Sequence, residues 1–253
     1  MVLRLLRADL KRAFGNGRFP LCVLGIAAVL FSAALYRLKA SGTVYAVYQA
    51  ARMASGSDIL TVAVLPVLPY SVSFASDLSA RAYPFWCVRC GAARWCRSRL
   101  ITALVSAWLT CFLGYWLFVA VLLPFRPITG TVGGSGPYGV YLQSGKQAMF
   151  FLFEFSHIAF SASLCAVAAV LASALIPSSF AAASVPAALY LAAQAVSQNL
   201  HIPAAVSLAA VLAGRYSAGT PLSSLAVKAA NVLVRCILAG AVAVRLMRKR
   251  VQR

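Results

Sequence analysis

Acidic side chains are the scarcest feature of this chain of 253 residues, which has 4 Asp and Glu residues against 23 Lys and Arg residues. Charged residues of both signs make up 11% of the sequence and hydrophobic residues 62%, whereas soluble domains are about 25% charged and about 45–50% apolar. So little polar material cannot cover the surface of a folded chain in water. The composition therefore excludes a soluble globular domain and predicts an integral membrane protein.

Common catalytic motifs are missing as well. The sequence has no P-loop G-x-x-x-x-G-K-[ST], no G-x-S-x-G, no H-E-x-x-H and no pair of intramembrane aspartates. One G-x-G-x-x-G match runs from Gly134 to Gly139, but it follows an apolar span instead of the strand that a dinucleotide-binding turn requires. We therefore predict no catalytic residues and no cofactor site in this chain.

Metal ligands are too few for a structural zinc site. Of the seven cysteines, Cys87, Cys90 and Cys96 alone lie close together, and structural zinc needs four ligands. The two histidines, His157 and His201, fall in other segments. The three cysteines are interpreted as reduced thiols, and no metal site is predicted.

Long apolar runs predict an all-α membrane fold, because a transmembrane helix needs roughly 20 apolar residues. We expect one transmembrane domain over residues 1–253, with six spans at about 19–36, 59–75, 100–123, 149–177, 180–197 and 229–247. The apolar run 202–213 is too short to cross, which predicts a short re-entrant or interfacial helix before the last span. In residues 1–17, Leu3, Leu6, Leu10 and Phe14 recur at helical spacing among basic residues, which predicts an amphipathic interface helix.

Six spans place both termini on one side of the membrane, and most basic residues fall on that side. They are Arg4, Arg7, Lys11, Arg12, Arg18, Arg81, Arg89, Arg94, Arg97, Arg99, Arg245, Arg248, Lys249, Arg250 and Arg253. The other side has Arg37, Lys39, Arg52, Arg126, Lys146, Arg215 and Lys228. Because Lys and Arg collect in cytoplasmic loops, this asymmetry predicts cytoplasmic termini in a plasma membrane. It also accounts for the net charge of +19 without a nucleic-acid partner.

Glu154 is the one acid inside a predicted span, and an intramembrane acid usually faces protein or a water-filled cavity. His157 lies on the same helical face, and Arg235 lies at a similar predicted depth in the last span. We therefore expect Glu154 and Arg235 to pair near the outer end of the bundle. The pair could form an outer gate or substrate contact, or it could be purely structural.

Two short stretches flank the predicted loop at 76–99. The second span ends in S-F-A-S-D, residues 73–77, and the next span begins after R-C-G-A-A-R-W-C-R-S-R, residues 89–99. Together with the basic helix L-R-A-D-L-K-R-A-F and six spans, this layout resembles the type-two permeases of bacterial ABC transporters, which are exporters. Trp95 stands where that family usually has Tyr, and Arg99 where it usually has Lys.

The resemblance implies a non-enzymatic permease that works with a separate ABC ATPase and a second permease subunit, identical or different. Residues 76–99 would then form a coupling loop on the ATPase, with the short outer helix near an outer gate. Aromatic and basic side chains of this loop would make the contact: Arg81, Tyr83, Phe85, Trp86, Arg89, Arg94, Trp95 and Arg99. The substrate expected from the family is a peptide, a lipid or another small amphipathic molecule.

A second class of function stays open on the sequence. A stand-alone secondary carrier, or a membrane scaffold or assembly protein, would have the same composition without an ATPase partner. A carrier would favour inverted repeats and charged groups near the middle of the membrane. No convincing repeat is present, which favours the permease.

Overall fold

The computed structural model describes residues 2–39, 42–54, 56–80, 88, 90–128, 136–199, 212 and 218–251, and these residues form helices and turns without a strand. In chain order the α-helices are α1 (Val2–Phe14), α2 (Arg18–Lys39), α3 (Val44–Met53), α4 (Ser73–Ser79), α6 (Ala92–Leu122), α7 (Gly139–Gln143), α8 (Gln147–Leu175), α9 (Ser179–Asn199) and α11 (Pro221–Val251). A π-helix, η1 (Ile59–Val64), and a 3₁₀ turn, η2 (Leu65–Val67), lie between α3 and α4.

Five of the helices, α2, α6, α8, α9 and α11, are long and apolar enough to cross a membrane. They match five of the six predicted spans and confirm a multi-pass, all-α architecture for the described residues. Two of them extend further than the apolar runs that predicted them. Helix α6 begins at Ala92 and α11 begins at Pro221, so each continues through polar and basic residues that precede its apolar stretch.

The predicted span at 59–75 is not a continuous α-helix, and this expectation was wrong. Pro66 and Pro69 fall in its middle, and a proline has no N–H to donate to the helical hydrogen-bond ladder. The backbone instead passes through η1, η2 and a series of turns before α4 begins. We call residues 57–77 the broken crossing. At one end the Ser57 hydroxyl donates to the backbone carbonyl of Ala51 in α3, and at the other end the Asp77 carboxylate accepts from Arg12 of α1.

Irregular backbone at membrane depth is tolerated where protein surrounds it, because lipid offers no hydrogen-bond partners. The broken crossing meets this condition. Thr61, Val67 and Tyr70 are all buried, and the segment packs against α2, α6, α8 and α9. The neighbouring helices therefore shield a backbone that could not face lipid.

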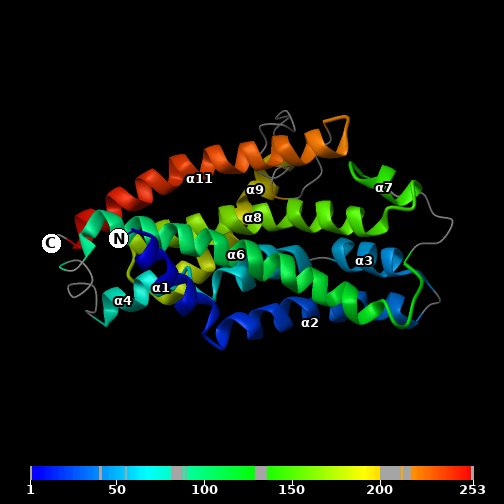
Figure 1. Cartoon of the computed structure of the whole chain (residues 1–253), viewed down its shortest axis with the longest axis horizontal. Helices are drawn as coiled ribbons and strands as arrows, with labels where there is room; N and C mark the ends of the chain where they lie inside the picture. Colours follow the sequence, from blue (N-terminus) through cyan, green and yellow to red (C-terminus); the bar gives the residue numbers. More distant parts are fainter. Residues whose placement is uncertain are drawn as a thin grey trace.

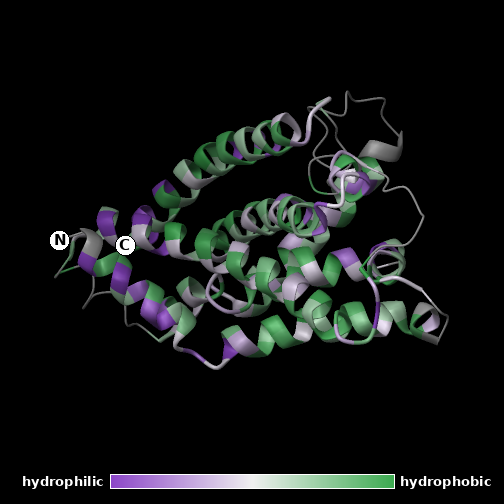
Figure 2. Ribbon diagram, turned by 45° about the vertical axis from the view of Figure 1, so that its right-hand side comes forward, coloured by the Kyte–Doolittle hydropathy of each residue, from purple (hydrophilic) through white to green (hydrophobic). Residues whose placement is uncertain are grey.

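Helix α8 is central in the bundle and packs against α6, α9 and α11 (Figure 1). Both chain termini lie at one end, together with α1 and α4, and we call this the terminal end. The opposite, distal end has α3 and α7. Hydrophobic residues line the helices along most of their length, while hydrophilic residues gather around the termini (Figure 2).

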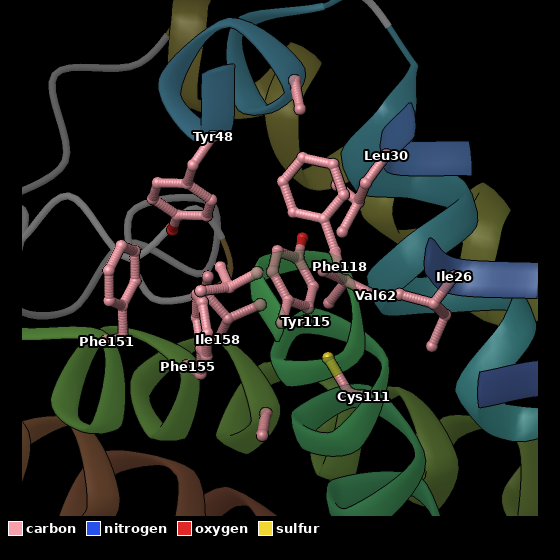
Figure 3. Close-up of a cluster of buried hydrophobic side chains, with 14 of the residues drawn as sticks. Ile26, Leu30, Tyr48, Val62, Cys111, Tyr115, Phe118, Phe151, Phe155 and Ile158 are labelled. Atoms are coloured by element: carbon pink, nitrogen blue, oxygen red, sulfur yellow. The ribbon is translucent and has the colours of Figure 1, made fainter. Parts of the chain in front are cut away.

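An aromatic cluster fills the core between α3, α6 and α8 (Figure 3). The ring of Phe155 lies 5.6 Å from Tyr48 and 5.5 Å from Tyr115, measured between centroids. Phe118 and Phe151 complete the cluster, and all five side chains are almost fully buried. Tilted and edge-to-face arrangements of this kind add to the free energy gained by burying the rings.

Helices α2 and α6 approach closely at Gly114. A Cβ atom at this position would lie 2.7 Å from both Cβ and Cγ2 of Ile26, a β-branched side chain that cannot swing away. Small residues allow such close approach between membrane helices. Gly114 therefore sets the distance between α2 and α6 beside the aromatic cluster.

We expect Gly114→Ala to destabilise the protein, because overpacking typically costs about 1–3 kcal/mol. The matched control is Gly25→Ala in α2, where a Cβ would meet Leu65 at an ordinary 3.6 Å. The measurement is the monodisperse fraction that remains after heating in detergent. The control should unfold at or slightly above the wild-type temperature; equal losses in both variants would show that Gly114 has no special packing role.

Candidate functional site

All four carboxylates of the chain lie in ion pairs, and they form two clusters at opposite ends of the bundle. Asp9 and Asp77 are at the terminal end, where they face Arg12 and Arg99. Asp58 and Glu154 are at the distal end, and both face Arg52. We call these groups the terminal cluster (Asp9, Arg12, Asp77 and Arg99) and the distal cluster (Tyr48, Arg52, Asp58 and Glu154).

Arg99 is the centre of the terminal cluster, and its side chain is 3% exposed. Its guanidinium donates to Asp77, and its Nε lies 3.7 Å from Asp9 Oδ1. A further hydrogen bond of 2.9 Å reaches the Ser73 hydroxyl. The planar cation also lies 5.3 Å from the ring centroids of Tyr70 and Trp95, a distance at which cation–π attraction operates. Two carboxylates, one hydroxyl and two aromatic rings therefore surround this buried cation, although its Nε atom makes no hydrogen bond.

Helix α1 supplies the other half of the terminal cluster. Arg12 donates to both oxygens of Asp77, at 2.9 and 3.2 Å, and this hydrogen bonding raises the pKa of Arg12. Asp9 accepts a short hydrogen bond from the Ser98 hydroxyl of α6. Three elements, α1, α4 and α6, are thus joined by charge-assisted hydrogen bonds, which are stronger than neutral ones.

The amphipathic helix predicted at residues 1–17 is present as α1, but its buried face differs from the expected one. Leu5, Asp9 and Ala13 are buried against the bundle. The apolar face predicted for this helix is only partly buried, since Leu6, Leu10 and Phe14 have intermediate exposure. The difference arises because Asp9 and Arg12 direct the helix toward Asp77 and Arg99, leaving the apolar stripe at the side.

Two residues assigned to the coupling loop are buried. Trp95 has no exposed surface and packs against Phe74 at 5.6 Å between ring centroids. Arg99 is equally inaccessible, so neither side chain can contact a partner in this conformation. Arg94 is exposed on the first turn of α6. Arg81, Tyr83, Phe85, Trp86 and Arg89 lie outside the described residues.

The distal cluster joins α3, the beginning of the broken crossing and α8. Arg52 Nη1 lies 3.0 Å from Glu154 Oε1, and Arg52 Nε lies 3.6 Å from Asp58 Oδ1. Tyr48 donates from its hydroxyl to the same Glu154 oxygen at 3.0 Å. Burial raises the pKa of Tyr48 well above its ordinary value, so Tyr48 remains a neutral donor. One cation therefore bridges two carboxylates from different elements.

Polar side chains continue along one face of α8 below Glu154, at the helical spacing of residues 154, 157 and 161. His157 Nδ1 lies 2.6 Å from the Tyr138 hydroxyl. The Ser161 hydroxyl accepts a hydrogen bond of 2.7 Å from the ammonium group of Lys228 in α11. Lys228 is only 4% exposed. A polar file thus leads from the distal end into the apolar bundle, and the sequence pattern had indicated only its first two members.

Arg235 does not lie at the depth of Glu154. Helices α8 and α11 run in the same direction, and the contact between Lys228 and Ser161 fixes their register. Arg235 consequently borders a cavity beside Ala168, roughly 20 Å along the axis from Glu154 at 1.5 Å per residue. The predicted partner is thus too distant, and Arg52 pairs with Glu154 instead. The sequence estimate failed because it placed the start of α11 at residue 229 instead of Pro221 and did not supply the register of α11 against α8.

The described residues contain no group of three or more His, Cys, Asp or Glu side chains that could hold a metal ion. Cys90 and Cys96 are free thiols, while Cys87 lies outside the described part of the chain. The predicted outer helix at 202–213 also falls outside it, apart from Leu212.

Comparison with protein-family models, with curated proteins and with solved structures found no match to this chain. The geometry of the two clusters, the broken crossing and the polar file therefore carries the functional argument.

Removing both partners of the Arg99–Asp77 pair should cost less stability than the sum of the losses from removing each partner alone. We expect Arg99→Gln to destabilise the protein by about 3–5 kcal/mol, because Asp77 would keep a buried charge with less compensation. Asp77→Asn should act similarly, and the double variant should lose less than the sum of the two. The loss of folded protein on heating in detergent measures each effect.

Arg7→Gln is the matched control for this cycle, since Arg7 is exposed on α1 and belongs to neither cluster. It should change stability by less than about 0.5 kcal/mol. Strict additivity of Arg99→Gln and Asp77→Asn would contradict a direct interaction between the two side chains.

Proposed function

We propose that this chain is the membrane-spanning permease subunit of an ATP-driven ABC transporter whose ATP hydrolysis takes place on a separate subunit. The observation that carries the proposal is the terminal cluster. The residues of the two stretches similar to type-two permeases, among them Phe74, Asp77, Trp95 and Arg99, contact one another directly. They do so at the base of the segment that the resemblance assigns to ATPase contact.

The terminal cluster gives that segment a rigid base. The segment follows α4, which ends at Ser79, and precedes α6, which begins at Ala92, and the Asp77–Arg99 pair joins these two helices. Arg12 attaches α1 to the same carboxylate. A partner that pushed on the segment would therefore move α1, α4 and α6 together, which is what a coupling element must do.

The broken crossing supplies a path for that movement. Its two ends are Asp58 in the distal cluster and Asp77 in the terminal cluster, and the prolines Pro66 and Pro69 interrupt the helix between them. A segment without a regular hydrogen-bond ladder bends more easily than an α-helix, and discontinuous helices recur in transporters. Displacement of α4 would in this way reach Asp58 and disturb its contact with Arg52.

Under this proposal the distal cluster is a latch on the outer side. Arg52 holds α3, the crossing and α8 together through Asp58 and Glu154, so an outward opening must separate these pairs. The latch is the gate role first assigned to Glu154, with Arg52 in place of Arg235. His157 and Lys228 lie below it along the polar file, where a substrate would pass.

A cavity of about 330 Å³ between α8, α9 and α11 fits an amphipathic substrate. Its walls are almost entirely apolar, and Arg235 is the charged residue of its lining. Pro186 interrupts the hydrogen bonding of α9 at the cavity wall. An acyl chain or an apolar peptide segment suits the walls, and an anionic group suits the arginine.

The charge distribution supports a plasma-membrane location with the terminal end in the cytoplasm. Most described basic residues lie at that end, where the hydrophilic surface gathers (Figure 2), as the positive-inside rule requires. A functional transporter of this class would pair the chain with a second permease, identical or different, and with the ATPase subunits.

A few features of the structure favour a stand-alone secondary carrier instead. The broken crossing and the buried Lys228 and His157 are features that carriers also use, since intramembrane charges often mark ion pathways. A carrier needs no ATPase, so the presence of that partner separates the two proposals.

We expect the chain to copurify in mild detergent with the ABC ATPase encoded nearest to its gene. The variant Tyr83→Ala/Phe85→Ala/Trp86→Ala should abolish copurification, because aromatic anchors dominate interface energies. Trp95 and Arg99 are unsuitable for this test, since both are buried and their replacement would perturb folding.

Tyr36→Ala/Phe125→Ala is the matched control, because both aromatics are highly exposed, at 84% and 80%, outside the segment 80–91. It should leave copurification intact. A chain that never retains an ATPase, in the wild type as in the variants, would overturn the permease proposal and favour the carrier.

A further inference from the structure

A second depression lies on the outer surface of the bundle, between α6 and α11 at the terminal end. It has a volume of about 550 Å³ and is formed entirely by described residues of these two helices. We call it the α6–α11 groove. It is separate from the cavity between α8, α9 and α11 and has no part in the proposed transport path.

The α6–α11 groove has a long apolar part and a basic end. Its apolar part contains Leu100, Ile101 and Leu104 of α6 and Leu233 and Ile237 of α11. Gly240 and Ala241 deepen it, because Gly240 allows Leu100 to approach α11 to a distance at which a Cβ atom would clash. These side chains belong to candidate spans, and Ile101, Leu233 and Ile237 are exposed on the outside of the bundle.

Three arginines close the groove at the terminal end. Arg97 lies on the first turns of α6, and Arg245 and Arg248 lie on the last turns of α11. All three are exposed. The two helices meet at this end of the bundle (Figure 1), which brings three positive charges to the rim of an apolar depression.

None of the four Asp and Glu side chains of the chain is placed to neutralise these arginines. All four of its carboxylates are held in the terminal and distal clusters. A molecule that occupies this groove would have to supply a negative charge at the arginines and fill the apolar part beside them. A phospholipid with an anionic headgroup meets both requirements, since basic pockets between membrane helices bind such headgroups.

A second copy of this chain meets them less well. A symmetric contact would place the same surface on both sides of the interface. Three arginines of each copy would then face one another without an intervening acid, which is unfavourable in a medium of low dielectric constant. We propose that the α6–α11 groove binds one anionic phospholipid, with its phosphate at Arg97, Arg245 and Arg248 and an acyl chain along the groove.

The test uses the purified full chain and phosphatidylglycerol, with phosphatidylcholine of the same acyl chains as the neutral comparison. Retained lipid is counted by native mass spectrometry after titration into detergent. Each basic residue near an anionic lipid contributes about a factor of five, corresponding to about 1 kcal/mol. The variant Arg97→Gln/Arg245→Gln/Arg248→Gln should therefore bind phosphatidylglycerol about a hundredfold more weakly, while phosphatidylcholine binding stays unchanged.

The matched control is Arg4→Gln/Arg7→Gln/Lys11→Gln, which removes the same charge from the exposed face of α1 at the same end. Equal weakening in the control would reduce the effect to general electrostatic attraction and overturn the site. A variant of the apolar part, Ala241→Phe, should weaken phosphatidylglycerol binding while all three arginines remain.

Inorganic phosphate serves as a competitor that lacks acyl chains. It should displace phosphatidylglycerol only at far higher concentration, and equal potency would show that the arginines bind a free anion instead of a lipid. Chemical cross-linking between two copies of the chain across the groove tests the remaining alternative, a dimer. A dimer whose cross-link survives added phosphatidylglycerol would assign this face to a second copy and overturn the proposal.

Discussion

Pairing of a few carboxylates with buried arginines is the constraint on which the rest of this bundle depends. A charge in an apolar interior is stable only when partners replace its lost hydration. Arg99 and Arg52 are both largely buried, and the chain offers only 4 acids to compensate them. Both arginines are therefore positioned where two acids from different elements can meet them. This requirement fixes how α1, α3 and α4 attach to the helices that span the bundle.

The same constraint explains why an irregular crossing is tolerated. The prolines in residues 57–77 remove helical hydrogen bonds, but Asp58 and Asp77 tie the two ends of the segment to neighbouring helices. Thr61 adds a contact with the Tyr115 hydroxyl at 3.1 Å within the core. Ionic anchors at both ends thus leave the middle of the crossing without a continuous α-helix, and the middle is where bending can occur without unfolding the bundle.

Hydropathy was sufficient to predict helices α2, α6, α8, α9 and α11, because long apolar runs admit few other structures in a bilayer. It was insufficient for residues 59–75, where the apolar character was correct but Pro66 and Pro69 altered the backbone. It also could not supply helix register. The partner of Glu154 depended on the register between α8 and α11, which places Arg235 beside Ala168, about four turns from Glu154.

Side-chain exposure was the other property that the sequence could not reveal. Trp95 and Arg99 read as members of a basic, aromatic surface because they follow a polar segment, yet both are interior groups that hold Asp77 and Phe74 in place. Their burial divides the arginines of the terminal end into two kinds. Arg12 and Arg99 are neutralised within the protein, while Arg97, Arg245 and Arg248 have no acid left to face. The scarcity of carboxylates that rigidifies the inside thereby leaves positive charge at the outside of the same end, where only anionic partners or lipid can balance it.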